Sequence, residues 1–570
     1  AGQTVLRTGY SLAYTREGFN SFNTMFGANE VPAISLGLSA STDPNEFVGP
    51  GSFKGPGSVY FRDGVFPFRA APEPSFPFTA RQNQSINDFN PNIKAGYVQS
   101  WTFGIQRELN KDTALEIRYV GNHGTHLWRQ YGVNEVNIFE NGFLDEFKIA
   151  MENLRIFREA NPNCGQPNRP ACNFANTGLP GQMPIPIIAT ALGTGFGTDI
   201  TFLTTVSRGE AGRLAANIAS NVTRMNRLIT ANLVPFVTLQ DPNNPANTLR
   251  LSNFFVVNPL AALGTGLPST GNSFIMDNGA GNTYNALQID LRRRLSNGLL
   301  VQGSYVWSKS MSNFFANESS VFSQPTTLRD FEHDKGPSPF DIRHAFKIDW
   351  IHELPIGPGR RFANTNMPVV SKLLEGWQWG GVARIQTGSP LLLTSGRFTF
   401  NQRDAGVVLH NISREQLQAL VKIRKETVCD STGECQGVVF WLPKSIIDNT
   451  LAAFEIQGTL NPNLPYIGPP TKPGELGNRI FLYGPMTARF DLNLMKRTRI
   501  TETANFEFRV QFLNAFNRAN FYLDNPNNSQ NDEGIGSEFG QTRFAYRDIT
   551  VSGTNDPGGR LIEFQLRLNF

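Results

Sequence analysis

The chain has 570 residues, a formal net charge of +4 and a charged fraction of 17%. A net charge this small gives no electrostatic reason to expect a nucleic-acid partner. The mean hydropathy is -0.27, and no run of about 18 apolar residues is present, which excludes a transmembrane helix. These values do not exclude a membrane β-barrel, because only every second residue of its strands faces lipid.

Apolar and polar residues alternate in several segments along the chain. Each alternation predicts a strand with one apolar and one polar face, because successive side chains of a strand point to opposite sides. The last segment, LIEFQLRLNF, is the clearest case, and it ends on Phe570. In chain order the predicted strands are residues 4–14, 97–108, 115–119, 287–292, 301–308, 342–354, 377–386, 486–494, 506–512 and 561–570.

The connections between these strands alternate between short and long. Short turns are expected near Lys111, Asn297, Gly357 and Arg499. Long insertions are expected at residues 15–95, 122–282, 310–341, 388–484 and 516–558. An outer-membrane barrel has short periplasmic turns and long outer loops, whereas a soluble sandwich has no reason to place every long loop at one end. We therefore predict an all-β fold, an antiparallel transmembrane β-barrel; a two-layer sandwich is the alternative.

The long insertions carry helical patterns of their own. Apolar residues recur at helical spacing in residues 140–160 and again in residues 209–232, which predicts amphipathic helices within the loops. Ser413 and Gln416 have the spacing of a capping box, which predicts a short helix after Ser413. These helices are expected to pack over the mouth of the barrel.

The four cysteines form two close pairs, Cys164 with Cys172 and Cys429 with Cys435. Both pairs lie in Gly-, Pro- and Asn-rich sequence, which favours short loop disulfides in an oxidising compartment. Zinc binding is the weaker alternative, since neither pair has the two-residue spacing or a nearby histidine.

No constellation of catalytic residues is found. His123 and His126 are close in sequence, but without carboxylate or cysteine neighbours they indicate a solvated loop more than a metal site. A Gly-x-Ser-x-Gly elbow is absent. The segment 524–536 is rich in Asp and Asn but lacks the spacing of an EF-hand. We expect no enzymatic activity, no cofactor and no metal.

Several stretches resemble the Oar-like TonB-dependent receptors, which are abundant in acidobacteria. They are YVQSWTFGIQREL (97–109), LEIRYVGNHGTHLW (115–128), YNALQIDLRRRLSNGLLVQGSYVWSKS (284–310), FDIRHAFKIDWIHELPIG (340–357) and FRVQFLNAFNRANF (508–521). The resemblance implies a barrel of about 22 strands in the outer membrane, filled by an N-terminal plug. Residues 1–570 correspond to the C-terminal portion, with about the last ten strands; no plug domain or TonB box is recognised in them.

The resemblance also implies partners. The apolar face would meet outer-membrane lipid, and an N-terminal portion or a second polypeptide would supply the remaining strands and the plug. TonB would act only through that portion. Phe570, a terminal aromatic residue on an alternating strand, would be the assembly signal. Two functions fit: ligand capture and uptake as part of a receptor or transporter, or a surface-structural or adhesive role on the same barrel.

Overall fold

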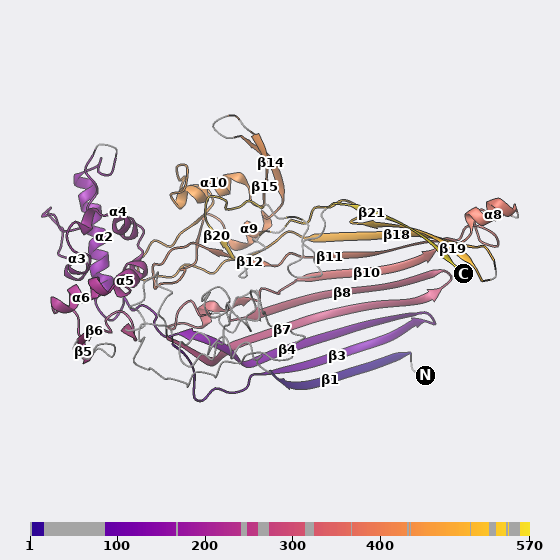
Figure 1. The fold of residues 1–570 in the computed structure, drawn as a ribbon, viewed down its shortest axis with the longest axis horizontal. Helices are drawn as coiled ribbons and strands as arrows, with labels where there is room; N and C mark the ends of the chain where they lie inside the picture. The colour runs from indigo at the N-terminus through magenta and orange to yellow at the C-terminus, as the bar shows by residue number, and fades with distance from the viewer. Residues whose placement is uncertain are drawn as a thin grey trace, which may run out of the picture.

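The structure is a computed structural model, and a single large sheet dominates it (Figure 1). It describes residues 3–15, 86–166, 169–240, 248–259, 273–313, 324–365, 367–429, 433, 435–501, 503–521, 523, 532–542, 545 and 559–570. None of the helices in these residues combines the length and the apolar character that a transmembrane helix needs.

Ten long antiparallel strands form the main path of a 12-stranded sheet, and each pairs with its neighbours along that path. They are β1 (Thr4–Tyr14), β3 (Tyr97–Asn110), β4 (Thr113–Gly132), β7 (Ser273–Ser296), β8 (Leu299–Ser312), β10 (His344–Glu353), β11 (Trp377–Gln386), β18 (Thr487–Arg499), β19 (Asn505–Leu513) and β21 (Leu561–Asn569). The two short additions are β2 (Ile86–Phe89), parallel to β7, and β9 (Gly336–Pro337), antiparallel to β8. This confirms the predicted all-β, antiparallel fold.

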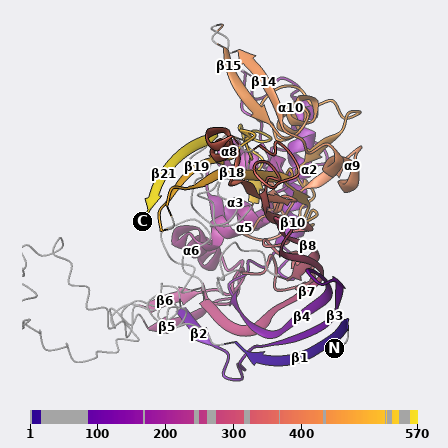
Figure 2. The ribbon, with the colours of Figure 1, turned by 90° about the vertical axis from the view of Figure 1, so that its right-hand side faces the viewer.

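The sheet is curved, with β1 at one edge and β21 at the other (Figure 2). Within the described residues, β1 pairs with β3 alone and β21 pairs with β19 alone. Every strand between them is hydrogen-bonded on both sides.

The register keeps apolar residues beside apolar residues from strand to strand. Ile117 pairs with Ile105 on one side and with Ile289 on the other. Further along the same row, Tyr305 pairs with Phe346. Because directly paired residues point to the same face, the predicted alternation produces one apolar face across the whole sheet.

The large apolar side chains of this face are exposed. In a soluble sandwich they would be buried between the two sheets. Phe103 in β3 is 52% exposed, and Phe564 in β21 is 71% exposed. The carboxylates of the other face are less accessible: the side chain of Asp290 is 16% exposed and that of Glu507 is 9% exposed. The polar side chains therefore lie on the concave face of the curved sheet.

The short turns gather at one end of the sheet, and the long insertions gather at the other (Figure 1). In the β7–β8 hairpin, Asn297 and Gly298 have φ angles of 51° and 75°, which are the positive values that a tight Asn-Gly hairpin turn requires. The link between β10 and β11 contains a short helix, α8 (Pro368–Leu374), that the sequence pattern did not predict.

Two strands run further than the sequence predicts, into the range 122–282 that we expected to be an insertion. β4 has 20 residues and β7 has 24. Their pairing continues past register shifts next to Leu127 and ends at Gly132 and Phe274. These irregularities interrupt the period of two, so the sequence pattern stopped short of the true strand ends.

Residues 133–259 contain a helical unit, which we call the helical insertion. Its elements are α2 (Phe143–Ala160), α3 (Pro186–Leu192), η2 (Phe196–Thr198), α4 (Ile200–Ser207), α5 (Ala211–Ala219), α6 (Val222–Thr230), β5 (Val237–Gln240) and β6 (Thr248–Leu251). Their apolar sides share a core that includes the fully buried Phe143, Phe147 and Ile188. The predicted helix at 140–160 is confirmed. The single helix expected at 209–232 is wrong, because Asn221 accepts a hydrogen bond from the Arg224 N–H and begins a second helix there.

The described residues of the range 388–484 form a second folded unit, which we call the mixed insertion. Its elements are β12 (Pro390–Thr394), β13 (Val408–His410), α9 (Arg414–Ala419), β14 (Arg424–Cys429), β15 (Cys435–Phe440), α10 (Lys444–Ala453), β16 (Tyr466–Gly468) and β17 (Phe481–Tyr483). The later strand β20 (Asp532–Gly534) joins β12, and η3 (Glu332–Asp334) lies in the loop after β8. The predicted capping box of Ser413 and Gln416 is present at the start of α9.

Disulfides occur in both insertions. Cys164 and Cys172 are joined by a disulfide with an S–S distance of 1.98 Å. In the mixed insertion Cys435 is disulfide-bonded and lies opposite Cys429 in the β14–β15 register; the side chain of Cys429 is outside the described residues.

A pair of arginine substitutions at neighbouring positions of β3 tests the assignment of the two faces. Phe103→Arg places a charge on the apolar face at the middle of the strand, where the cost in a bilayer is about 2–4 kcal/mol. Thr102→Arg places the same side chain on the polar face and is expected to cost less than about 1 kcal/mol. Equilibrium unfolding by urea in lipid vesicles measures both; equal losses of stability would contradict the assignment.

Candidate functional site

Ion pairs and hydrogen bonds connect the charged side chains of the concave face. Arg118 of β4 donates to the side-chain oxygen of Gln288 at 2.7 and 3.0 Å, and its guanidinium lies 3.6 Å from Glu116 and 3.9 Å from Asp290. At the short-turn end, Glu507 lies 3.0 Å from Arg497 and 3.1 Å from Arg509. Such pairs of opposite charge suit a surface that borders a water-filled space, because each charged group there keeps either water or an ion-pair partner.

At the other end of the sheet, a buried carboxylate holds two arginines. Asp334 of η3 lies 2.7 Å from Arg129, near the end of β4, and 3.1 Å from Arg479 of the mixed insertion. It also accepts hydrogen bonds from the backbone N–H and the hydroxyl of Thr326, at 2.9 and 2.6 Å. Asp334 and Arg129 are almost fully buried.

The charge balance of this cluster explains its ionisation. Burial raises the pKa of the Asp334 carboxyl, but Arg479, Thr326 and Arg129 outweigh burial and hold the pKa below its ordinary value of 3.8. Nearby, burial lowers the pKa of Arg403 to about 10. The cluster ties the strand end, the loop after β8 and the mixed insertion into one unit.

A second cluster joins the helical insertion to the mixed insertion. Glu210, directly before α5, is buried and accepts from Arg397 at 3.2 Å and from Arg213. Arg208 lies 3.1 Å from Glu455. A Cβ atom at Gly212 would lie 2.2 Å from the carbonyl oxygen of Asn401, so only glycine permits this approach of the two backbones. The insertions are thus held together by charge and by close backbone packing.

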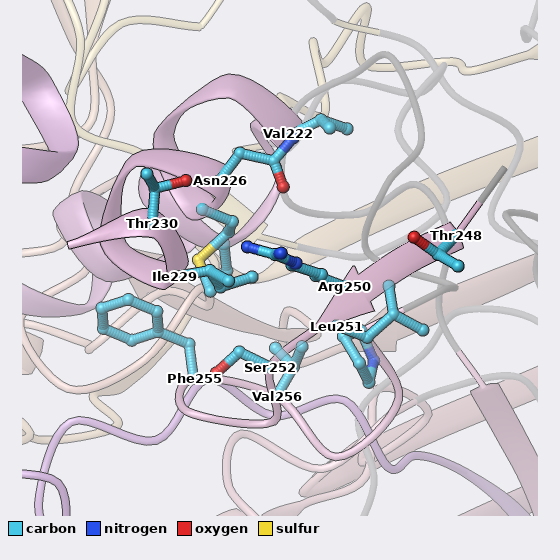
Figure 3. Close-up of a pocket in the computed structure, with 13 residues that line it drawn as sticks. Val222, Asn226, Ile229, Thr230, Thr248, Arg250, Leu251, Ser252, Phe255 and Val256 are labelled. Atoms are coloured by element: carbon cyan, nitrogen blue, oxygen red, sulfur yellow. The ribbon is translucent and has the colours of Figure 1, made fainter. Parts of the chain in front are cut away.

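The helical insertion contains a cavity of about 320 Å³ between α6 and β6 (Figure 3). One face of α6 and the segment after β6 supply its apolar lining, and Arg250 of β6 is its cation. Arg250 reaches from β6 towards Asn226 and Ile229 of α6 (Figure 3), and its guanidinium carbon lies 5.6 Å from the ring centre of Phe236. The lining residues are Ala219, Val222, Met225, Asn226, Ile229, Thr230, Thr248, Arg250, Leu251, Ser252, Phe255, Val256 and Pro259.

The chemistry of this cavity is amphipathic. Met225, Ile229 and Phe255 offer an apolar wall, while Asn226, Ser252 and Arg250 offer polar groups. None of the described lining residues carries a carboxylate. The cavity therefore suits a ligand with an apolar body and one negative charge, because the guanidinium can bind a carboxylate, sulfonate or phosphate.

The residues weighed as metal ligands from the sequence are not brought together. The Nδ1 of His123 lies 3.1 Å from the Thr283 hydroxyl, and the ring of His126 packs on Tyr97 at 5.8 Å. Among the described residues, no group of three His, Cys, Asp or Glu side chains could hold a metal ion. Of the segment 524–536, residues 524–531 lie outside the described residues.

Sequence analysis did not identify the Asp334 cluster or the cavity at Arg250. Both assemble side chains from segments far apart in the chain, and neither has a local motif. The only local signal for the cluster was the charged run that contains Asp330, Glu332 and Asp334, which reads as an ordinary solvated loop.

We expect Asp334→Asn to destabilise the folded insertions by about 3 kcal/mol or more, because two arginines lose a buried counter-ion. Asp330→Asn, at an exposed position of the same loop, should change stability by less than about 0.5 kcal/mol. Thermal unfolding with limited proteolysis of the insertions measures the difference.

Since the folded pKa of Asp334 is depressed, its contribution should be complete above pH 4 to 5 and should be lost as the pH falls below about 3.8. Two results would contradict this account. One is a wild-type stability of the insertions that does not change in acid, and the other is an equal stability of the Asp334→Asn and Asp330→Asn variants.

Comparisons with known proteins place the fold. The family described as outer membrane beta barrel domain matches residues 1–183 and 190–550. No curated protein matches the chain at a significant level. Among solved structures, the outer membrane transporter YddB from Escherichia coli is similar at 6% identity and a TM-score of 0.31, covering 85% of this chain and 34% of that one.

Two further structures are similar at the same level. The ferripyoverdine receptor of the outer membrane of Pseudomonas aeruginosa has 8% identity and a TM-score of 0.28, covering 84% of this chain and 28% of that one. The copper transporter OprC has 8% identity and a TM-score of 0.24, covering 84% and 32%. The chain thus spans about a third of the length of these proteins. The family match covers most of the sequence, and the chain belongs to the outer-membrane β-barrel family and resides in the outer membrane.

Proposed function

We propose that the chain is the ligand-capturing barrel portion of an outer-membrane, TonB-dependent receptor or transporter. The observation that carries the proposal is the amphipathic cavity at Arg250, which lies in a folded insertion at the end of the sheet opposite the short turns. An ion-paired concave face runs from that end, where Arg489 lies 3.1 Å from Asp491, towards the short turns. This arrangement best supports capture of a ligand at the helical insertion, followed by its passage along the polar concave face. We propose no chemical reaction for the chain.

The two sheet edges favour a partner that completes the barrel. Within the described residues, the outer edges of β1 and β21 have no neighbouring strand. In hydrocarbon each unpaired backbone group costs several kcal/mol, so an open edge is unfavourable. We propose that further strands, from an N-terminal portion or from a second polypeptide, pair with both edges. The plug and the contact with TonB would belong to that portion, as the resemblance to Oar-like receptors implies.

A surface-structural or adhesive role is the second candidate. The folded insertions, their disulfides and the buried ion pairs at this end of the sheet would also suit a stable surface display. Whole-cell uptake and cell attachment of a deletion strain separate the two roles. Loss of attachment with unchanged uptake would count against transport.

Ligand capture at the cavity is tested with an amphipathic anion as a probe. The purified protein in nanodiscs is titrated with 4-(trifluoromethyl)benzoate, and ¹⁹F NMR line broadening reports binding. Arg250→Gln should weaken binding about tenfold, because a charge-assisted hydrogen bond is lost. Arg158→Gln, on α2 and outside the cavity lining, should leave binding unchanged. Equal binding of the neutral 4-(trifluoromethyl)benzyl alcohol, or no effect of Arg250→Gln, would contradict an anion site.

Phe570 tests the assembly role that the resemblance implies. This residue is 95% exposed beyond the end of β21, so its removal takes away no packing within the described residues. Its deletion should lower the amount of heat-modifiable barrel in the outer membrane, whereas Phe570→Tyr, which keeps an aromatic ring, should not. Normal barrel levels after the deletion would argue against the role.

A further inference from the structure

The helix α8, on the link between β10 and β11, lies at the short-turn end of the sheet (Figure 1), and its apolar side chains are exposed. Val369 is 76% exposed and Leu373 is 63% exposed; Met367 and Val370 are also exposed. No residue of α8 is buried. Hence the helix does not serve a core of the described protein, although its sequence, PVVSKLL, is mostly apolar.

Specific hydrogen bonds nevertheless fix the C-terminal end of α8. The indole N–H of Trp377 donates to the carbonyl of Leu373 at 2.9 Å. The Lys496 ammonium donates to the carbonyls of Lys372, Leu373 and Glu375 at 2.8, 2.9 and 2.8 Å. One lysine from β18 therefore binds two carbonyls of the last helical turn and the carbonyl of the C-cap residue Glu375, so this end of the helix is held in a defined position.

The two anchoring residues identify the side of the sheet on which α8 lies. Trp377 and Lys496 are paired across β11 and β18, and the Lys496 ammonium lies 5.2 Å from the ring centre of Trp377. Two residues further along each strand, Trp379 pairs with Leu494 on the exposed apolar face. Since residues two apart share a face, Trp377 and Lys496 also belong to the apolar face, and α8 continues that face beyond the strand ends.

The connection after α8 is built for a sharp turn back into β11. Gly376 has a φ angle of 71°, and a Cβ atom there would lie 1.9 Å from the carbonyl oxygen of Arg497. Only glycine fits this position.

Basic residues outnumber acidic ones around the helix. On the link that contains α8 and on the adjoining ends of β10 and β18, the cations are Arg360, Arg361, Lys372, Lys496, Arg497 and Arg499; the carboxylates are Glu353 and Glu375. Glu375 pairs with Lys372 at 2.9 Å, and Glu353 pairs with Arg360 at 3.3 Å. The net charge of these segments is positive, at the level where lipid head groups would meet the end of the apolar face.

We propose that α8 is an interfacial anchor that inserts Val369, Val370 and Leu373 into the periplasmic leaflet and binds the phosphate of anionic phospholipids through its basic rim. A short apolar helix with a cationic border is suited to the head-group region, and each basic residue near an anionic surface adds attraction. The occupant is lipid because the exposed face of α8 is continuous with the lipid-facing surface of β11 and β18. The anchor is independent of whether the protein transports a ligand.

Spin labels test the insertion depth in the protein purified from its outer membrane and reconstituted into vesicles. A label at Val369→Cys should be more accessible to oxygen than to a water-soluble nickel complex, and a label at Lys111→Cys, at an exposed position of the short β3–β4 turn, should show the reverse. Equal aqueous exposure at both positions would overturn the proposal. So would shielding of Val369→Cys from both reagents, since a protein surface would then cover the helix.

Substitution of Lys496, which anchors α8, gives a second readout. It tests the helix in a barrel that remains folded. Lys496→Met removes the three hydrogen bonds to the end of α8 and keeps the apolar stem. We expect the label at Val369→Cys to become more mobile while the barrel stays heat-modifiable. Unchanged mobility in an intact barrel would show that Lys496 does not hold the helix and would contradict the proposed anchor.

Lipid selectivity is measured by native mass spectrometry after reconstitution in phosphatidylcholine mixed with phosphatidylglycerol. The wild type should retain phosphatidylglycerol several-fold over phosphatidylcholine. The double variant Arg361→Gln and Lys372→Gln should lose most of that preference, whereas Arg155→Gln and Arg158→Gln, the same charge change on α2, should keep it. No preference in the wild type, or an equal loss in both double variants, would overturn the assignment of head-group binding to α8.

Discussion

Backbone hydrogen bonding between neighbouring strands is the constraint on which the rest of this structure depends. In hydrocarbon a peptide group has no water to bind, so each strand needs a partner on both sides. The antiparallel path from β1 to β21 meets this need for every strand except at its two edges within the described residues. The same pairing sets the register, and the register then determines which side chains meet lipid and which meet water.

That register explains why the two faces differ so sharply. A slip of one residue would turn every apolar side chain inwards and every charge outwards. Here Ile105, Ile117 and Ile289 form one continuous row, while Glu116 and Asp290 form another with Arg118 close by. Individual ion pairs on the concave face contribute little to stability, yet they allow charged side chains to line a sheet whose other surface is apolar.

The two ends of the sheet are specialised in different ways. At the end with the long insertions, buried carboxylates such as Asp334 and Glu210 hold segments from distant parts of the chain in one arrangement. At the short-turn end, a single lysine and a tryptophan fix α8 on the apolar face. The first end is held together by buried ion pairs and contains a cavity, and the second is held together by the hydrogen bonds that fix α8.

Much of the fold follows from the sequence, because a period of two, an Asn-Gly turn and a capping box are all local. These local patterns predicted the strands, the alternation of short and long connections, and the start of α9. The ends of β4 and β7 were missed because register shifts near Leu127 interrupt the period, and the break at Asn221 was missed because apolar spacing continues across it. The Asp334 cluster, the cavity at Arg250 and the position of α8 were decided only by tertiary structure, since each joins residues that no local pattern relates.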